Sequence, residues 1–421
     1  MHSHPETVLL GMSGTITKRS LHDFAHILEW ALGKRRMPLP ASNRDLDEWA
    51  RAVDVDKNGF RPRVPPGALH VLYGEMETTV AKLEPLRAAR VAVRRRIKET
   101  AGVVSSEEGD DVDSSLNITV RAVEGYDKRI VELFHQMNNG VLPNGDPITD
   151  ATLGVRWGKC RELTSGFYYE WDPRPPDAWI AARRTWKQSA AEVLDRHLSG
   201  LESEGTIASI VLRAGANGLN KLGVGKDLAQ DTAKAQEAWQ RIRNSFKPNI
   251  VPRWECDRMV NEIAKWADNH KGLIWISEVA LGQRLEKEGI VPYYANQGLD
   301  AKKRFVEDAK KKDGSIALSI ASNSEGRNLQ HEWSENLMVS CPPTGTTWEQ
   351  CMGRTHRPGQ PEDEVDFETL IGCSVEHQCW VQANDDAVYA GLDGRKKLTY
   401  CSKTVEEMPW GSNALWRKNT L

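Results

Sequence analysis

The sequence predicts an α/β protein in which a mostly parallel sheet, covered by helices on both faces, follows a mixed and largely helical segment. From about residue 250, short apolar strand-like runs alternate with helical stretches, which is typical of parallel strands joined by helices. Between about 40 and 245 the pattern is instead one of helical runs separated by Pro- and Gly-rich stretches. A chain of 421 residues is also long enough for two or three domains.

Hydrophobic periodicity places the individual elements. In the second half of the chain we expect strands at 273–276, 290–294, 316–320, 337–340 and 365–371, and helices at 279–288, 301–311, 347–356 and 375–391. In the first half we expect helices near 78–99, 177–198 and 230–245, and a strand at 116–122.

The N-terminal stretch reads as a short strand, Val8–Leu10, and then an amphipathic helix with Leu21 and Leu28 on its apolar face. Ser20 and Asp23 form a capping box at the start of this helix. Little chain precedes the strand, so it has no obvious partner. We therefore expect the apolar face of this stretch to lack its natural cover.

Composition bounds the class of protein. The chain is 39% hydrophobic and 27% charged, which is typical of a soluble globular protein, and its net charge of -3 neither favours nor excludes nucleic acid. Its seven cysteines have irregular spacing and form no C-x-x-C pair, so we expect reduced thiols and no metal site. No secretory signal and no apolar run of about 18 residues is found. These features predict a cytoplasmic protein, of a bacterial cell or a phage-infected host, with no membrane partner.

The strongest chemical signal is the stretch TGTTWEQCMGRTHRPGQ at 344–360. Thr347 and Gln350 are expected to cap a helix on which Gln350, Arg354 and Arg357 share one face. Two guanidinium groups on one face suit a polyphosphate and the role of an arginine finger. Spacing alone leaves open a second interpretation, a solvated helix with two ordinary arginines.

A resemblance to a known family favours the first interpretation. The last helicase motif of superfamily-two motors is matched by Gln350, Gly353, Arg354, His356, Arg357, Gly359 and Gln360. The ending HRPGQ resembles the Swi/Snf branch of these motors. The stretch SIASNSEGRNLQ at 319–330 resembles the preceding motif, although Ser322–Glu325 departs from its alanine-glycine pattern.

Two further stretches resemble the same family. GLIWIS, ending at Ser277, followed by YYANQGLDAKKRFVEDAK, is similar to the first strand of the second motor lobe and its glycine turn. Ser13, Gly14 and Thr15 resemble the motif that closes the first lobe, with Ile16 where that motif has proline.

The resemblance implies the C-terminal part of an ATP-dependent, nucleic-acid-stimulated helicase or translocase. Residues 246–395 would form a complete second RecA-like lobe, 1–40 a remnant of the first lobe, 41–245 a helical insertion or bridge, and 396–421 an extension. ATP and Mg²⁺ would lie between the lobes, with Gln350 ordering Arg354 and Arg357 at the γ-phosphate.

Other matched residues would couple the nucleotide to the nucleic acid, and these are Gly326, Asn328, Gln330, Gly353, His356 and Gln360. Ser277 and Ser319 would contact the nucleic acid, with DNA favoured over RNA.

The sequence contains no G-x-x-x-x-G-K-[ST] phosphate loop and no Asp-Glu tetrad of the kind that holds magnesium. We therefore expect a second polypeptide to carry the N-terminal ATPase lobe, and this chain to be inactive alone. The alternative is a non-catalytic nucleic-acid-binding or interaction protein derived from a helicase lobe.

Two other patterns allow two interpretations each. Arg94, Arg95 and Arg96 lie in a basic helical run that either grips a phosphate backbone or forms a solvated face. An aromatic-rich stretch between basic residues either fills a core, which we favour, or stacks unpaired bases. Its aromatic residues are Trp157, Phe167, Tyr168, Tyr169, Trp171, Trp179 and Trp186.

Overall fold

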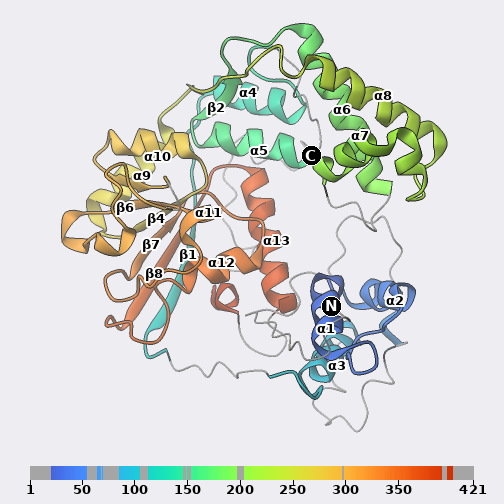
Figure 1. Cartoon of the computed structure of the whole chain (residues 1–421). Helices are drawn as coiled ribbons and strands as arrows, with labels where there is room; N and C mark the ends of the chain where they lie inside the picture. Colours follow the sequence, from blue (N-terminus) through green and yellow to red (C-terminus); the bar gives the residue numbers. More distant parts are fainter. Residues whose placement is uncertain are drawn as a thin grey trace. The chain divides into compact units, whose positions relative to one another are not determined.

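The computed structural model describes residues 20–54, 64–67, 69, 85–104, 112–145, 148, 153–196, 203–295, 298–390 and 396–401. The chain divides into two compact units (Figure 1). The first unit holds the described residues of Met1–Val123 and Glu262–Gly411, and the second holds those of Glu124–Asn261.

A six-stranded sheet forms the centre of the first unit. Its strands are β1 (Ser115–Ala122), β4 (Leu273–Ile276), β5 (Val291–Tyr293), β6 (Ile316–Ser319), β7 (Glu335–Met338) and β8 (Glu364–Ile371). They pair in the order β1-β8-β7-β4-β6-β5, and every pair is parallel. The helices that flank the sheet are α9 (Arg258–Asn269), α10 (Val279–Glu286), α11 (Ile320–Asn323), α12 (Gly345–Met352) and α13 (Ser374–Ala390). This confirms the predicted α/β class, a parallel sheet flanked by helices as in a RecA-like lobe.

The central strands are buried because they are apolar on both faces. Ile274, Leu318 and Leu337 have no exposed surface, as expected where helices cover both sides of a parallel sheet. One polar network crosses this core. The Asn336 amide accepts a hydrogen bond from the Trp275 indole at 3.2 Å and donates to the Thr355 hydroxyl at 3.1 Å. The network thereby joins the central strands to the segment that follows α12.

Strand β1 comes from a part of the chain that the sequence analysis assigned to the helical insertion. It pairs with β8 over its full length, from Ser115 opposite Glu364 to Ala122 opposite Ile371. Arg121 fastens it further through ion pairs with Glu262 and Glu368. The sheet is therefore not complete within residues 246–395, because its edge strand pairs across nearly 250 positions of sequence.

The helix expected at 301–311 is wrong. Two short 3-10 turns stand there instead, at Val306–Asp308 and Lys311–Asp313. The cause is the buried Asp300 carboxylate, which accepts from the backbone N–H groups of Lys302 and Arg304 at 2.9 and 2.7 Å. A side chain that captures these donors offers the backbone an alternative to the helix.

The N-terminal helices of the first unit pack on one another. They are α1 (His22–Leu32), α2 (Asn43–Val53) and α3 (Pro85–Lys98), and they share one apolar core. Leu21 and Leu28 are buried in this core against Val53 and Val93, so the expectation that their face lacks cover is wrong. Strand Val8–Leu10 lies outside the described residues.

The second unit is mainly helical. Its elements are α4 (Lys128–Asn138), α5 (Leu153–Thr164), β2 (Phe167–Trp171), α6 (Asp177–Arg196), α7 (Glu204–Asn220), α8 (Lys226–Ile242) and β3 (Ile250–Trp254). Strands β2 and β3 form an antiparallel pair. Helices α6 to α8 share a core around Trp186, Ile207 and Leu219. The burial of Phe167, Tyr168, Trp179 and Trp186 confirms packing for these four aromatic residues.

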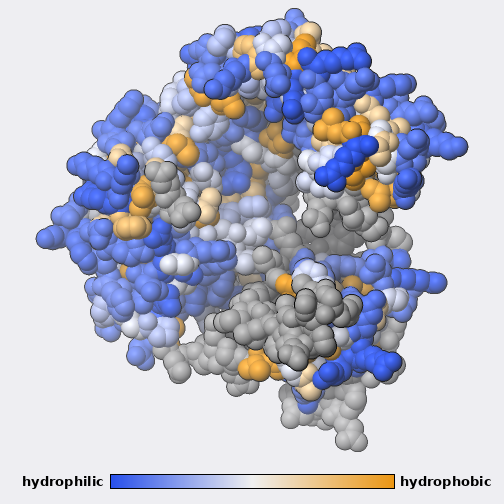
Figure 2. Space-filling view, viewed as in Figure 1, coloured by the Kyte–Doolittle hydropathy of each residue, from blue (hydrophilic) through white to orange (hydrophobic). Residues whose placement is uncertain are grey.

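The surface seen in Figure 2 is mainly hydrophilic, with small hydrophobic areas scattered over it. Within the described part of the chain, no helix is both long and apolar enough to cross a membrane.

Candidate functional site

The candidate site is built on α12 and the turns that follow it. The helix starts earlier than expected, because the Thr344 side chain accepts a hydrogen bond from the Thr347 backbone N–H at 3.3 Å. Thr344, and not Thr347, is therefore the N-cap. The helix ends at Met352, so Arg354 and Arg357 lie in the turns beyond it and not on one helical face. A carbon atom added to Gly353 would lie 3.0 Å from the Glu349 carbonyl, so this turn favours glycine.

Arg354 is held by two backbone carbonyls. Its Nε donates to the Gln350 carbonyl and its Nη1 donates to the Arg327 carbonyl, both at 2.9 Å. The guanidinium is half-buried, and this burial, with the charge of Arg357 beside it, lowers the pKa of Arg354. An arginine nevertheless keeps its charge in a protein. Arg354 thus fastens the end of α12 to the loop that contains Gly326.

Arg357 is more open. It is partly exposed, and its Nη1 donates to the Asn328 side-chain oxygen at 2.7 Å. This partner is a neutral amide at the surface, which is easier to exchange for a charged acceptor than a buried carbonyl. Of the two arginines, Arg357 is therefore the one placed to offer donors to an incoming anion.

A third contact joins the same two segments. The Gln350 amide nitrogen donates to the Glu325 carboxylate at 2.7 Å. Glu325 precedes Gly326, whose positive φ of 70° turns the loop back toward α12. The structure thus brings Gln350, Arg354 and Arg357 together with residues 325–328, which stand far apart in sequence.

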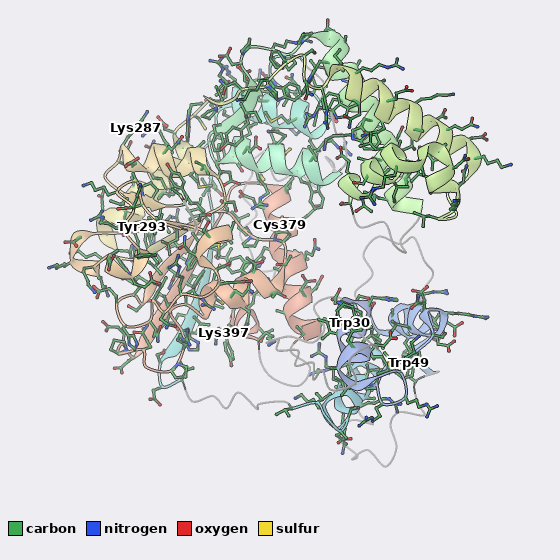
Figure 3. The ribbon with its side chains drawn as sticks, in the orientation of Figure 1. Trp30, Trp49, Lys287, Tyr293, Cys379 and Lys397 are labelled. Carbon is green, nitrogen blue, oxygen red and sulfur yellow. The ribbon has the colours of Figure 1, made fainter. Side chains whose placement is uncertain are left out.

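The side chains of His356 and Gln360 donate hydrogen bonds to backbone carbonyls of neighbouring segments. The His356 ring is buried and its Nε2 donates to the Ser114 carbonyl at 2.9 Å, which ties this turn to the residue before β1. Burial lowers the pKa of His356, and the nearby Lys397 charge, labelled in Figure 3, acts in the same direction. The Gln360 amide nitrogen donates to the carbonyls of Trp333 and Thr355, both at 3.0 Å.

Gln330 is also buried. Its amide lies 3.3 Å from the ring nitrogen of His331, and its side-chain oxygen has no hydrogen-bond partner within the described structure.

Ser277 and Ser319 lie at the same edge of the sheet. Ser277 directly follows β4, and Ser319 is the last residue of β6, where it pairs opposite Ile276. The carboxyl ends of parallel strands are where such sheets bind ligands. The Ser277 backbone N–H donates to the Ser340 hydroxyl, which in turn donates to Glu278 at 2.8 Å.

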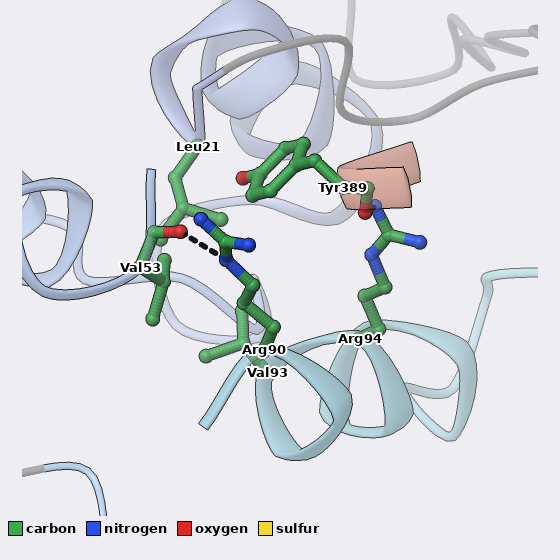
Figure 4. Close-up of a pocket in the computed structure, with 6 residues that line it drawn as sticks. All are labelled: Leu21, Val53, Arg90, Val93, Arg94 and Tyr389. Carbon is green, nitrogen blue, oxygen red and sulfur yellow. Dashed lines mark hydrogen bonds between the residues drawn. The ribbon is translucent and has the colours of Figure 1, made fainter. Parts of the chain in front are cut away.

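The predicted basic run lies on α3, and all three of its arginines have intramolecular partners. The Arg94 guanidinium donates to the carbonyls of Tyr389 and Ala390, at the C-terminal end of α13 (Figure 4). Arg96 donates to the Pro38 carbonyl at 2.7 Å. Arg95 is exposed and forms an i, i+4 ion pair with Glu99.

Tyr389 is held between α3 and α2. The guanidinium groups of Arg90 and Arg94 lie 4.8 and 5.3 Å from the centre of its ring. Its hydroxyl donates to Asp54 at 3.2 Å. Burial raises the pKa of Asp54 to about 6, against the lowering effect of its hydrogen bonds. These contacts hold the N-terminal helices to the end of α13.

Sequence reasoning missed one exposed basic loop. Asp300 organises residues 300–304 so that Lys302 and Lys303 project into solvent, and Lys303 has a positive φ of 62°. Phe305 follows them and is 55% exposed. The run AKKRF was visible in the sequence, but it was expected within a helix, where these side chains would point in different directions.

The first-lobe motif, Ser13 to Thr15, lies outside the described residues. Of the other predicted site residues, Gln350, Arg354, Arg357 and Asn328 are joined in one cluster, with Gly326 and Gly353 in its turns. Ser277 and Ser319 at the sheet edge and the arginines of α3 lie outside this cluster.

Comparison with known proteins adds little beyond the fold. No family model matches the chain, and no curated protein sequence matches it. A solved structure that is similar to this chain is the C-terminal part of the Fun30 ATPase domain. The two share 15% sequence identity over 64% of this chain and 89% of that one, with a TM-score of 0.30. The class defined by the structure itself is that of an α/β protein with a parallel sheet flanked by helices.

Proposed function

We propose that this chain supplies the second RecA-like lobe of an ATP-driven, nucleic-acid-stimulated helicase or translocase of the Swi/Snf type. The observation that carries the proposal is the junction of residues 350–357 with residues 325–328, which holds Arg354 and leaves Arg357 partly exposed. In this proposal a separate polypeptide supplies the phosphate loop and the Asp-Glu pair, and DNA is the favoured track.

The two arginines have different parts in this proposal. Arg357 exchanges its Asn328 partner for a γ-phosphate oxygen and neutralises charge that develops during transfer, the role of an arginine finger. Arg354 is a positioning residue, because both of its contacts are to backbone carbonyls of the same junction. Gln350 holds the loop at Glu325 against the end of α12 through its hydrogen bond to the Glu325 carboxylate.

Magnesium does not fit the residues at hand. Among the described residues, no group of three or more His, Cys, Asp or Glu side chains is placed to hold a metal ion. We therefore assign Mg²⁺ and the β-phosphate to the first lobe.

The nucleic-acid track is proposed to pass the carboxyl edge of the sheet. Ser277 and Ser319 lie at that edge, and the loop with Lys302 and Lys303 leaves β5, the strand beside β6. Hydroxyl donors and lysines are the groups that contact phosphate oxygens without reading sequence. Of the α3 run, Arg95, which pairs with Glu99 at the surface, is the member proposed to make such a contact.

The test is reconstitution with a polypeptide that carries a phosphate loop and an Asp-Glu pair, sought first in the DNA immediately upstream of Met1. We expect no hydrolysis by this chain alone, and DNA-stimulated hydrolysis when both polypeptides are present. A mixture that binds DNA but never hydrolyses ATP would favour the non-catalytic alternative.

A further inference from the structure

The second unit carries a partly exposed set of aromatic side chains beside β2 and β3. Trp171 ends β2 directly opposite Ile250, so the two side chains project from the same face of the antiparallel pair. Ile250 is 58% exposed and Trp171 is partly exposed. Large apolar side chains left open to water in this way mark a candidate contact surface.

A buried tryptophan supports this surface from below. The ring of Trp179 lies 5.7 Å from that of Trp171 and 5.9 Å from that of Phe246, edge to face in both pairs. The Trp179 indole N–H donates to the Arg243 carbonyl at 3.3 Å. Trp179 therefore contacts both Trp171 and the segment 243–247, and holds them next to each other. We call Trp171, Phe246 and Ile250 the aromatic platform.

Positive charge surrounds the platform. The Arg183 guanidinium lies 5.3 Å from the centre of the Trp171 ring and 5.6 Å from that of Trp179. Arg243 and Lys247 are exposed, and neither has a carboxylate partner among the residues that the structure describes. The platform therefore has Arg183 against its Trp171 ring and two exposed cations in the adjoining segment 243–247.

Three acidic side chains nearby pair with two arginines, which leaves one net negative charge against the three cations Arg183, Arg243 and Lys247. Arg253 pairs with both Glu170 and Asp172, the latter at 3.0 Å, and Arg174 pairs with Asp177 at 2.8 Å. The charge left at the platform is positive, so the partner it fits is an anion with flat apolar groups.

We infer that the aromatic platform binds an unpaired nucleic-acid strand, with a base stacked on Trp171 and phosphates beside Arg243 and Lys247. Bases stack on such rings whatever their sequence, and lysine and arginine neutralise the backbone. A duplex keeps its bases stacked inside and offers no free base to the ring. The identity of the polymer rests on the proposed function, which this inference deepens by assigning a single-strand contact outside the RecA-like lobe.

The experiment measures binding of the full chain to fluorescein-labelled (dT)20 by fluorescence anisotropy, beside a 20-base-pair duplex. Trp171→Ala should weaken (dT)20 binding at least about fivefold, the lower bound for losing one stacked base. Duplex binding should change less than twofold. The matched control is Trp30→Ala, because Trp30 in α1 is 57% exposed and belongs to the first unit (Figure 3).

A second variant avoids any effect on packing. Arg243→Glu with Lys247→Glu changes two exposed cations and should weaken (dT)20 binding while lowering the slope of log K against log salt by about 1 to 2. Lys234→Glu, at an exposed cation of α8, should leave both quantities unchanged.

The outcomes separate this inference from the proposed function. Unchanged (dT)20 binding by both platform variants would overturn the inference, and if a Lys302→Glu variant then abolished binding, the proposed lobe track would stand alone. Equal losses for (dT)20 and duplex would also overturn it. Loss of (dT)20 binding in the platform variants, with no ATP hydrolysis in any reconstituted mixture, would retain the platform and reject the motor.

Discussion

Arg354 and Arg357 should differ sharply in what they contribute to stability. Arg354 donates two hydrogen bonds to backbone carbonyls at a half-buried position, whereas Arg357 donates one to a side chain at the surface. A hydrogen bond from a charged donor contributes about 1.5–3 kcal/mol when buried, and less when water can replace it. Allowing for partial exposure, we expect Arg354→Ala to cost about 2–4 kcal/mol and Arg357→Ala about 0.5 kcal/mol.

Thermal melting of the full chain, followed by circular dichroism, measures this difference. At about 2–3 °C per kcal/mol for a unit of this size, Arg354→Ala should lower the melting temperature by roughly 4–12 °C. Hydrogen exchange should also accelerate at Leu329, whose N–H donates to the Arg354 carbonyl at 3.2 Å. Arg354→Lys keeps the charge but cannot bridge both carbonyls, so it should fall between the two. Equal melting temperatures for the two alanine variants would refute the division of roles.

Two further predictions concern groups that hold segments together. The pKa of Asp54 is raised from 3.8 to about 6 in the folded protein, so its stabilising contribution is complete below pH 3.8 and is lost as the pH rises through 6. The melting temperature of the wild type relative to Asp54→Asn should therefore fall between about pH 4 and pH 6 and level off above, and a flat difference would contradict this. His356→Ala leaves the Ser114 carbonyl unpaired and should cost about 1–3 kcal/mol. Hydrogen exchange should then accelerate in β1 more than in β4, and uniform protection would show that His356 does not hold the edge strand.

The parts of the fold that the sequence predicted well are those with local signals. The run Leu273–Ile276 is apolar at every position because both faces of the strand are covered, and it was placed at its observed bounds. Helix α13 was likewise expected within a residue of where it lies, since it is a long stretch without glycine or proline.

The parts that were predicted poorly depend on distant or competing contacts. Nothing near Leu116 indicates that its strand pairs with Val365, because that pairing is set by the sheet and not by the local pattern. The helix expected at 301–311 failed because one buried side chain, Asp300, captured the backbone donors that a helix needs. The apolar face of α1 was expected to be open because its cover comes from α2 and α3, which follow later in the chain.

The candidate site shows the same limit. Motif spacing identified Gln350, Arg354 and Arg357 as a group, and the structure places them together. Spacing could not show that Arg354 is held by backbone and Arg357 by a side chain. Their partners, the Arg327 carbonyl and the Asn328 amide, come from a separate loop. It also treated the segment as one helix, although the helix ends at Met352.

The most direct measurement of the central claim is DNA-stimulated ATP hydrolysis by this chain mixed with a first-lobe polypeptide. With Arg357→Ala, turnover in the mixture should fall by a factor on the order of 10³ while DNA binding without nucleotide stays unchanged. Arg44→Ala, at an exposed arginine of α2 that pairs with Glu48, serves as the control and should retain full turnover. If Arg357→Ala instead abolished DNA binding and spared turnover, Arg357 would belong to the track, and the proposed role of the junction at residues 350–357 would be contradicted.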